Sequence, residues 1–382
     1  MNSTEENIIP IKENTARRGR NFFNGIMMFA NHIAVIALLI SYFAPYVSPE
    51  NFWYIAFFGL AYPVFVLVNL LFVIYWGIQF KKQMLYSLLI IFGGWLHLQE
   101  YLQINLTEKP DKPLNTIKVM SYNVRLFDLY KWSNKIDTRN NMLELIKNEN
   151  PDIICLQEFS SSDNNLQFNN LDTLIKIQKS KNTHIEYTGK VNKTNQYGVA
   201  IFTAYPIISK GKIIFDKHSN NICIYSDLLI NEDTVRVYNV HLQSIHLGYE
   251  DYKFVDDLMK NHETEELEKS KNILKRIKRA FIKRSTQTEL VSEHIAKSPH
   301  PVIICGDFND PPVSYSYHTI SENLKDAFIE SGEGLGRSYI GKFPSLRIDY
   351  ILHSKQFMAY DFRTINQELS DHFPICCLLH KN

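Results

Sequence analysis

The chain divides into two parts by its pattern of apolar and polar positions. From Phe22 to about Leu98 there is hardly a charged residue, whereas after about Asn115 short apolar runs alternate with polar stretches. Apolar runs of about 20 residues are typical of helices that span a membrane. Short apolar runs bounded by turn residues are typical of buried strands. The pattern therefore predicts a helical, membrane-embedded N-terminal region followed by a globular domain.

The apolar region contains three runs. The first two, about 22–47 and about 52–80, are separated by the turn residues of 48–51, and each is long enough to cross a bilayer. The third, about 84–98, is short unless it continues to Ile104, and a re-entrant or interfacial helix is the alternative. We therefore expect about three transmembrane helices in this region.

Basic residues flank these runs. Arg17, Arg18 and Arg20 precede the first run, and Lys81 and Lys82 lie between the second and the third. The positive-inside rule places both groups in the cytoplasm. Three crossings then predict an integral protein of the inner or plasma membrane whose C-terminal domain is periplasmic or extracellular. If the third run does not cross, that domain is cytoplasmic. A cleaved signal peptide is disfavoured because the first run is too long and lacks a clear small-residue cleavage site.

The rest of the chain has the pattern of a mixed α/β domain. Apolar runs predict strands at Ile117–Asn123, Ile153–Gln157, Gly198–Phe202, Ile222–Ile230, Thr234–His241, Val302–Gly306, Ile348–Leu352 and Ile375–Leu379. Helices are predicted at Arg139–Lys147, about Asp256–Lys297 and Ser316–Phe328. Helices that alternate with strands and hairpins favour an α/β sandwich with mixed sheets. We divide the chain into residues 1–21 (cytoplasmic tail), 22–104 (transmembrane region), 105–116 (linker) and 117–382 (globular domain).

Charge and cysteine content add little. The net charge is +1, which argues mildly against a broad surface for binding polyanions. The five cysteines lack metal-ligand spacing and lie in apolar runs, so we interpret them as small buried side chains. The long stretch of about 256–297 begins with acidic residues and continues with basic ones. It is either a solvated helix packed on the domain or an arm that contacts anionic lipid or nucleic acid.

The sequence Gly306-Asp307-Phe308-Asn309 carries the strongest chemical signal. It follows an apolar run, so two polar side chains are expected at the end of a buried strand. An ordinary turn is the alternative, because Asp, Asn and Gly dominate turns. Other predicted strands end in the same way, with polar side chains at Asn123, Glu158, His241, Asp349, Asp371 and His372.

Each of these residues has an ordinary alternative when it is taken alone. The alternatives are a turn cap for Asn123, a helix-start carboxylate for Glu158, a core histidine for His241, an Arg347 partner for Asp349, and a polar loop for Asp371 and His372. Six strand ends of this kind in one chain are hard to explain by accident. We therefore expect the polar ends to meet in one site.

The set resembles the endonuclease/exonuclease/phosphatase superfamily. That superfamily includes apurinic-site endonucleases, deoxyribonuclease I, neutral sphingomyelinases and inositol-polyphosphate 5-phosphatases. The resemblance covers about Ile117 to Leu379, and its most specific pieces are Gly306-Asp307-Phe308-Asn309 and Ser370-Asp371-His372. The membrane helices lie outside it. The resemblance implies a four-layer α/β/β/α sandwich with two mixed sheets and a site at one end of the sheets.

The resemblance also implies a metal and a role for each residue. A hard divalent ion, Mg²⁺ or Mn²⁺, would neutralise an anionic phosphate ester. Glu158, Asn123 and Asp371 resemble the family's metal-site residues, and the number of metal ions stays open.

The remaining residues resemble the family's catalytic groups. Asp307 would orient or deprotonate the attacking water, and Asn309 would donate its amide to a phosphoryl oxygen. His372 would contact the phosphate or act as acid or base, held by Asp349. His241 would stabilise the phosphate or the leaving group.

We therefore expect a membrane-anchored, divalent-metal-dependent phosphoesterase. Its substrate would be nucleic acid or a phospholipid or head-group phosphate, as a diester or a monoester, and no protein partner is predicted. A non-catalytic membrane scaffold or sensor that keeps the fold is the alternative, disfavoured because the site positions carry chemically competent side chains. The sequence lacks GxSxG and Walker motifs, which disfavours serine-nucleophile and P-loop chemistry.

Overall fold

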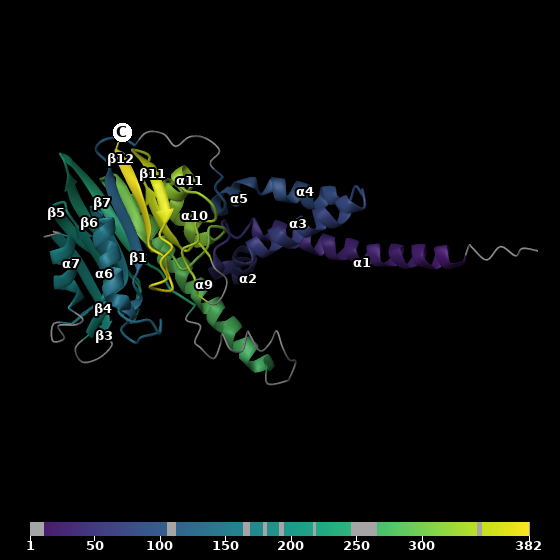
Figure 1. Cartoon of the computed structure of the whole chain (residues 1–382), viewed down its shortest axis with the longest axis horizontal. Helices are drawn as coiled ribbons and strands as arrows, with labels where there is room; N and C mark the ends of the chain where they lie inside the picture. The colour runs from purple at the N-terminus through teal and green to yellow at the C-terminus, as the bar shows by residue number, and fades with distance from the viewer. Residues whose placement is uncertain are drawn as a thin grey trace, which may run out of the picture.

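The computed structural model describes residues 11–104, 112–162, 169–178, 182–190, 195–216, 219–245, 266–341 and 346–381. Parts of three predicted segments lie outside these residues: 1–10 of the tail, 105–111 of the linker and 256–265 of the long helix. A helical N-terminal region projects from one side of a β-sandwich (Figure 1).

The sandwich contains two six-stranded sheets. The first has the order β11-β12-β1-β2-β4-β3, and the second has the order β5-β6-β7-β8-β10-β9. The strands of the first sheet are β1 (Ile117–Asn123), β2 (Ile153–Ser162), β3 (Asn182–Lys190), β4 (Asn195–Thr203), β11 (Phe357–Thr364) and β12 (Ile375–Lys381). Those of the second are β5 (Ile207–Ile214), β6 (Ile222–Ile230), β7 (Asp233–His241), β8 (Val302–Asp307), β9 (Lys325–Asp326) and β10 (Asp349–His353).

Both sheets are mixed, as predicted. β1 pairs in parallel with β2, and β7 pairs in parallel with β8, while the other pairings are antiparallel. Each of the eight predicted strands is present, with bounds that shift at some ends. The sequence pattern missed β3, β5, β9 and β11. These strands form the edges of the two sheets, where many side chains are exposed or half-buried and polar residues interrupt the apolar pattern.

Three apolar clusters define the layers. The largest lies between the sheets and includes Val119 and Ile351. A second lies between the first sheet and the helices α6 (Thr138–Glu149) and α7 (Asn170–Gln178). A third lies between the second sheet and the helices α9 (Glu266–Ala296) and α10 (Tyr315–Ser321). The result is an α/β/β/α sandwich, with α6 and α7 away from α9 and α10 (Figure 1).

The helix predicted at Ser316–Phe328 is wrong as a single element. α10 ends at Ser321, the short strand β9 follows, and α11 (Ala327–Ser331) begins after it. Asp326 explains the break, because its side chain accepts a hydrogen bond from the backbone N–H of Phe328 (2.9 Å) and so caps α11. The same residue pairs with Leu352 in β10, which holds the chain in an extended conformation.

The expectation of three membrane-spanning helices is not supported. Within the part of the chain that the structure describes, one helix is long and apolar enough to cross a membrane, at Arg18–Ser41 within α1 (Ile11–Ser41). A second span is possible if α2 (Pro49–Leu60) and α3 (Tyr62–Ile78) count together, although they are bent by 49°. The third run is divided between the short helices α4 (Met84–Gly93) and α5 (Trp95–Tyr101).

Tyr42 explains why the third run is divided. A Cβ atom at Gly94 would lie 2.3 Å from the ring of Tyr42, so only glycine permits this close approach. The Tyr42 hydroxyl also donates to the carbonyl of Ile90 (2.7 Å). Three crossings can therefore no longer be used to predict that the domain is periplasmic.

The helical region packs directly on the sandwich. Phe57 of α2 contacts Phe281 of α9 edge to face, with ring centroids 5.2 Å apart. The Lys278 ammonium lies 4.9 Å from the centroid of the Trp53 ring. The Arg347 guanidinium donates to the carbonyl of Glu100 (2.8 Å). The two parts of the chain therefore share an interface that reaches Arg347, just before the start of β10.

The long helix α9 packs on the domain along part of its length, and its contact with lipid or nucleic acid stays a prediction. Its C-terminal half packs on the second sheet and buries Ala280, Phe281, Arg284 and Val291. Its N-terminal half extends away from the sandwich (Figure 1). Each of the five cysteines is buried and unpaired, which confirms their interpretation as small core side chains.

Candidate active site

The first sheet brings four of the predicted site residues to one edge. Asn123 ends β1 and is paired with Gln157 of β2, and Glu158 follows directly. Asp371 and His372 precede β12, which is the other neighbour of β1. These side chains therefore come from three adjacent strands of one sheet.

The second sheet contributes the remaining residues at the same edge. His241 at the end of β7 is paired with Asp307 at the end of β8. Asp307 is paired in turn with Asp349 at the start of β10. Asn309 lies two residues beyond Asp307, and its backbone N–H donates to the Asp307 carboxylate (2.8 Å). The site is thus assembled from both sheets.

Asp307 lies at the centre of the group. Its Oδ2 atom accepts a hydrogen bond from Nδ2 of Asn123 (3.0 Å), which joins the two sheets. The same oxygen lies 3.8 Å from Nε2 of His241 and 3.7 Å from Nε2 of His372. Both distances are longer than a hydrogen bond, so a water or a substrate oxygen can bridge them. Burial raises the pKa of Asp307, and the charge of His372 opposes this shift.

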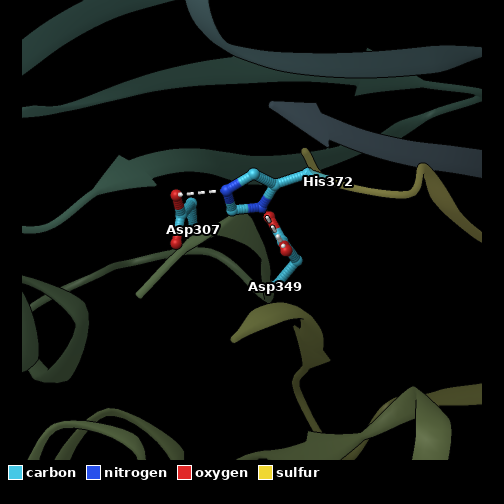
Figure 2. A group of neighbouring side chains, drawn as sticks. All are labelled: Asp307, Asp349 and His372. Carbon is cyan, nitrogen blue, oxygen red and sulfur yellow. Dashed lines mark hydrogen bonds and ion pairs between the residues drawn. The ribbon is translucent and has the colours of Figure 1, made fainter. Parts of the chain in front are cut away.

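His372 is held between two carboxylates (Figure 2). Its Nδ1 atom lies 2.8 Å from Oδ2 of Asp349, so the hydrogen-bond partner of Asp349 here is His372 and not Arg347. Burial disfavours the imidazolium, but the charges of Asp349 and Asp307 outweigh burial and raise the pKa of His372 to about 10. The backbone N–H of Asp349 donates to Ser338 Oγ (3.0 Å), which holds the backbone of Asp349 in place. The two carboxylates therefore favour the protonated, positively charged form of the ring.

Glu158 occupies a strained position. Its φ of 50° is left-handed, and the pairing of β2 with β4 shifts register between Leu156 and Phe159. A bulge of this kind re-aims a side chain next to a functional site. Burial and the nearby charge of Asp371 raise the pKa of Glu158 to about 7. Two carboxylates thus share one region, which is a suitable environment for a cation.

Two sets of side chains could hold a metal ion. Ligand atoms of Asp307, Asp349 and His372 all lie within 4.8 Å of one another. The second set consists of Glu158, Asp371 and Asn123, whose oxygen atoms match the preference of Mg²⁺ and Mn²⁺ for hard donors. In the first set, Asp349 and His372 already satisfy each other through their hydrogen bond. The second set offers two carboxylates and an amide oxygen, although Asn123 Oδ1 and Asp371 also contact Arg125.

The side-chain amide of Asn309 is already partly engaged within the protein, which the sequence did not predict. Its side-chain Nδ2 donates to the carbonyl of Leu242 (3.0 Å), which leaves one amide hydrogen for a substrate. The carbonyl of Asn309 accepts from Arg284, whose Nε lies 3.1 Å from Oδ2 of Asp310. Arg284 belongs to the basic stretch and is fully buried.

Several supporting residues were not predicted from sequence. Gln157 and Asn239 are fully buried and join the two sheets below the site, with Nε2 of Gln157 donating to Oδ1 of Asn239 (2.7 Å). Asn239 also donates to the carbonyls of Leu156 and Ala200 (both 2.9 Å). The sequence did contain a signal for these two residues, because each is an amide side chain beside apolar residues in a predicted strand. A buried amide requires hydrogen-bond partners, so such a residue predicts a polar contact inside the core.

A pocket of about 280 Å³ adjoins the site at Asp371. Its lining residues include Arg125, Asp128, Lys135, Ile340 and Ser370. The Nε atom of Arg125 lies 3.4 Å from Oδ2 of Asp371. The pocket therefore places a cation directly beside a candidate metal ligand.

Two mixed sheets that are stacked face to face, with helices outside and a polar site where strands of both sheets end, define the α/β/β/α sandwich class. Within this class, the chain belongs to the endonuclease/exonuclease/phosphatase family, whose sequence model matches residues 120–372. The members of this family are phosphoester hydrolases, and the match therefore supports hydrolase activity for this chain. Residues 24–101 match a domain of unknown function.

Solved structures share the sandwich fold. An endonuclease/exonuclease/phosphatase protein from Bacteroides vulgatus is 16% identical, with a TM-score of 0.50, covering 70% of this chain and 100% of its own. The human Nocturnin catalytic domain with bound sulfate is 18% identical, with a TM-score of 0.50, covering 70% of this chain and 95% of its own. A functionally unknown conserved protein from Enterococcus faecalis V583 is 16% identical, with a TM-score of 0.50, covering 70% of this chain and 100% of its own. No curated protein matches the sequence.

Proposed function

We propose that the protein is a divalent-metal-dependent phosphoesterase whose site is the group at the common sheet edge. The observation that carries the proposal is the environment of Asp307. Its carboxylate accepts from Asn123 and faces the imidazoles of His241 and His372. This arrangement supports the family's chemistry, in which water attacks a phosphate ester.

Each side chain has a role in that reaction. Asp307 accepts the proton of the attacking water while the water oxygen forms its bond to phosphorus and the ester oxygen leaves. The imidazolium of His372 stabilises the negative charge that gathers on the phosphoryl oxygens, and Asp349 keeps it oriented. His241 supports the same oxygens from the other side of Asp307. When a divalent ion is bound, it neutralises and polarises the phosphate.

We assign the ion to Glu158, Asp371 and Asn123. The raised pKa of Glu158 supports this choice, because it reflects the burial of the carboxylate and the nearby charge of Asp371, both of which a bound cation would offset. The Glu158→Gln substitution is expected to lower kcat for bis-p-nitrophenyl phosphate or p-nitrophenyl phosphate by about 10³-fold and to weaken Mn²⁺ binding. We would measure both with the full chain in detergent, with Mg²⁺ or Mn²⁺ and with EDTA.

Two variants make this test specific. Glu322→Gln makes the same change at an exposed position outside the site, and it should behave like the wild type. Asp349→Asn separates the two candidate metal sets. If Mn²⁺ still binds Glu158→Gln but not Asp349→Asn, the ion belongs to Asp307, Asp349 and His372. Activity that survives EDTA would contradict metal dependence altogether.

The substrate class that follows is a phosphate ester of nucleic acid or of a lipid head group. A membrane anchor favours esters at or near the bilayer. The apolar helix at Arg18–Ser41, with Phe22, Phe29 and Ile36 exposed, supports such an anchor. The start of α1 and the turn between α3 and α4, which carries Lys81 and Lys82, lie at the end of the helical region away from the sandwich (Figure 1).

This polarity supports an orientation in which the sandwich lies on the side of the membrane opposite the basic end, outside the cytoplasm. A C-terminal alkaline phosphatase fusion should then be active, because that enzyme needs disulfides that form in oxidising compartments. A green fluorescent protein fusion at the same position should be dark. The reverse pattern would place the sandwich in the cytoplasm and contradict this orientation.

A further inference from the structure

We propose that residues 125–135, which follow β1, form a substrate subsite in which Tyr130 and Trp132 stack on an aromatic ring of the phosphate ester and Arg125 binds one of its anionic oxygens. The inference rests on the proposed function and assigns its substrate class. The ester would carry a flat aromatic ring near the phosphate, as a nucleotide does.

The first observation is an exposed aromatic pair. Tyr130 is 50% exposed and Trp132 is 40% exposed, and their ring centroids are 5.0 Å apart. Large aromatic side chains are usually buried, and adjacent exposed ones often mark a binding surface. The faces of such rings attract other flat rings and cations.

The second observation is the cation that connects this pair to the site. The Arg125 guanidinium lies 4.6 Å from the centroid of the Trp132 ring. Its Nε is 3.4 Å from Asp371, a residue assigned to the metal. Arg125 also lines the pocket of about 280 Å³, which is near the lower end of the volume range of small-molecule sites. One side chain thus touches the aromatic pair, the pocket and the candidate metal site.

The third observation is that the backbone of the segment has an energetically unfavourable conformation. Four consecutive residues, Arg125 to Asp128, have left-handed φ angles between 43° and 56°. This conformation is unfavourable for residues with a Cβ, and such strain tends to occur at functional sites. Asn123 Oδ1 accepts from the backbone N–H of Arg125 (3.1 Å), and Phe127 is buried in the core. The turn is therefore anchored to a site residue.

The geometry of Arg125 also orients the pair relative to the site. Arg125 lies against the ring of Trp132 and beside Asp371, which is assigned to the metal. A ring stacked on Trp132 would therefore bring its attached phosphate toward the candidate metal site.

Two esters with the same leaving group test the subsite. Thymidine 5′-(p-nitrophenyl phosphate) carries an aromatic base, and ethyl p-nitrophenyl phosphate does not. We expect the full chain with Mn²⁺ to favour the thymidine ester about ten- to a hundredfold in kcat/KM, mainly through KM, because each stacked base contributes on this scale. The Tyr130→Ala/Trp132→Ala variant should lose most of that ratio, and Trp132→Phe should retain most of it.

The control substitution is Tyr360→Ala, which removes a partly exposed tyrosine of β11 outside the site. Its ratio should equal that of the wild type. A wild-type ratio near one, or a ratio unchanged in the double variant, would overturn the subsite. Arg125→Gln should raise KM for both esters, since both carry the phosphate.

Isothermal titration calorimetry measures ligand binding directly, so it tests the subsite even if the protein does not hydrolyse the esters. Thymidine 5′-monophosphate should bind the full chain at least tenfold more tightly than methyl phosphate, and the double variant should abolish the difference. If neither ester is hydrolysed but this difference appears, the proposed function fails and the ring subsite stands. Equal binding of the two phosphates would overturn the subsite. Glucose 6-phosphate that binds as tightly as the nucleotide would overturn the assignment to an aromatic ring.

Discussion

The Asp307→Asn variant is expected to hydrolyse phosphate esters at least about 10³-fold more slowly than the wild type, because it loses the group that takes a proton from water. The substitution keeps the shape of the side chain and removes its charge. The new amide group can turn its NH₂ toward Asn123 and the two imidazoles, which the carboxylate of Asp307 faces in the wild type. A hydrogen-bond acceptor is then replaced by a donor. The loss should appear in kcat.

Steady-state hydrolysis of bis-p-nitrophenyl phosphate measures this effect. Asp361→Asn is the matched control, since it makes the same change outside the site, at a residue that forms an ion pair with Lys112 on the surface. It should keep wild-type kinetics. The melting temperature of Asp307→Asn should stay close to that of the wild type. A variant that is folded and retains a tenth of the wild-type kcat would rule out Asp307 as the proton acceptor.

The Arg347→Met variant is expected to lose about 3–5 kcal/mol of unfolding free energy, because it leaves a buried carboxylate without its partner. The Nη1 atom of Arg347 lies 2.6 Å from Oδ2 of Asp326, and both side chains are nearly inaccessible to solvent. Arg347 also donates to Glu100 in the helical region. Removing it uncouples α5, α11 and the start of β10 together.

Arg363→Met is the informative comparison. Arg363 contacts Glu149 at the same distance of 2.6 Å, but its side chain is 45% exposed. Exposed pairs contribute about 0–1 kcal/mol, so the two substitutions should differ several-fold. Urea unfolding of the full chain in detergent, followed by near-ultraviolet circular dichroism, provides both values. Equal effects would show that burial does not set the strength of the Arg347 interaction.

The sandwich could be predicted from sequence because its central strands are rich in buried apolar residues. β1, β7 and β8 are such strands, and their polar ends indicated the candidate site residues. The edge strands β3 and β5 carry mostly half-buried or exposed side chains, and their polar residues interrupt the apolar pattern. A register shift as at Glu158 depends on the partner strand and is likewise hidden in the sequence.

Long-range partners account for the other misses. Arg284 lies within a run of basic residues, and sequence alone does not distinguish it from its exposed neighbours. The division of the third apolar run depends on Tyr42, a residue that is distant in sequence from Gly94. Arg125 reaches the site only because the backbone after β1 turns left-handed, a conformation that its residue types do not favour.

The division of the site between two sheets has a consequence for the newly made chain. Asn123, Glu158, Asp371 and His372 come from one sheet, and His241, Asp307 and Asp349 come from the other. Neither sheet alone contains the whole candidate site. The proposed site is therefore complete only after the apolar faces of the two sheets have packed together, so we expect no hydrolysis of phosphate esters by a chain that is still partly unfolded.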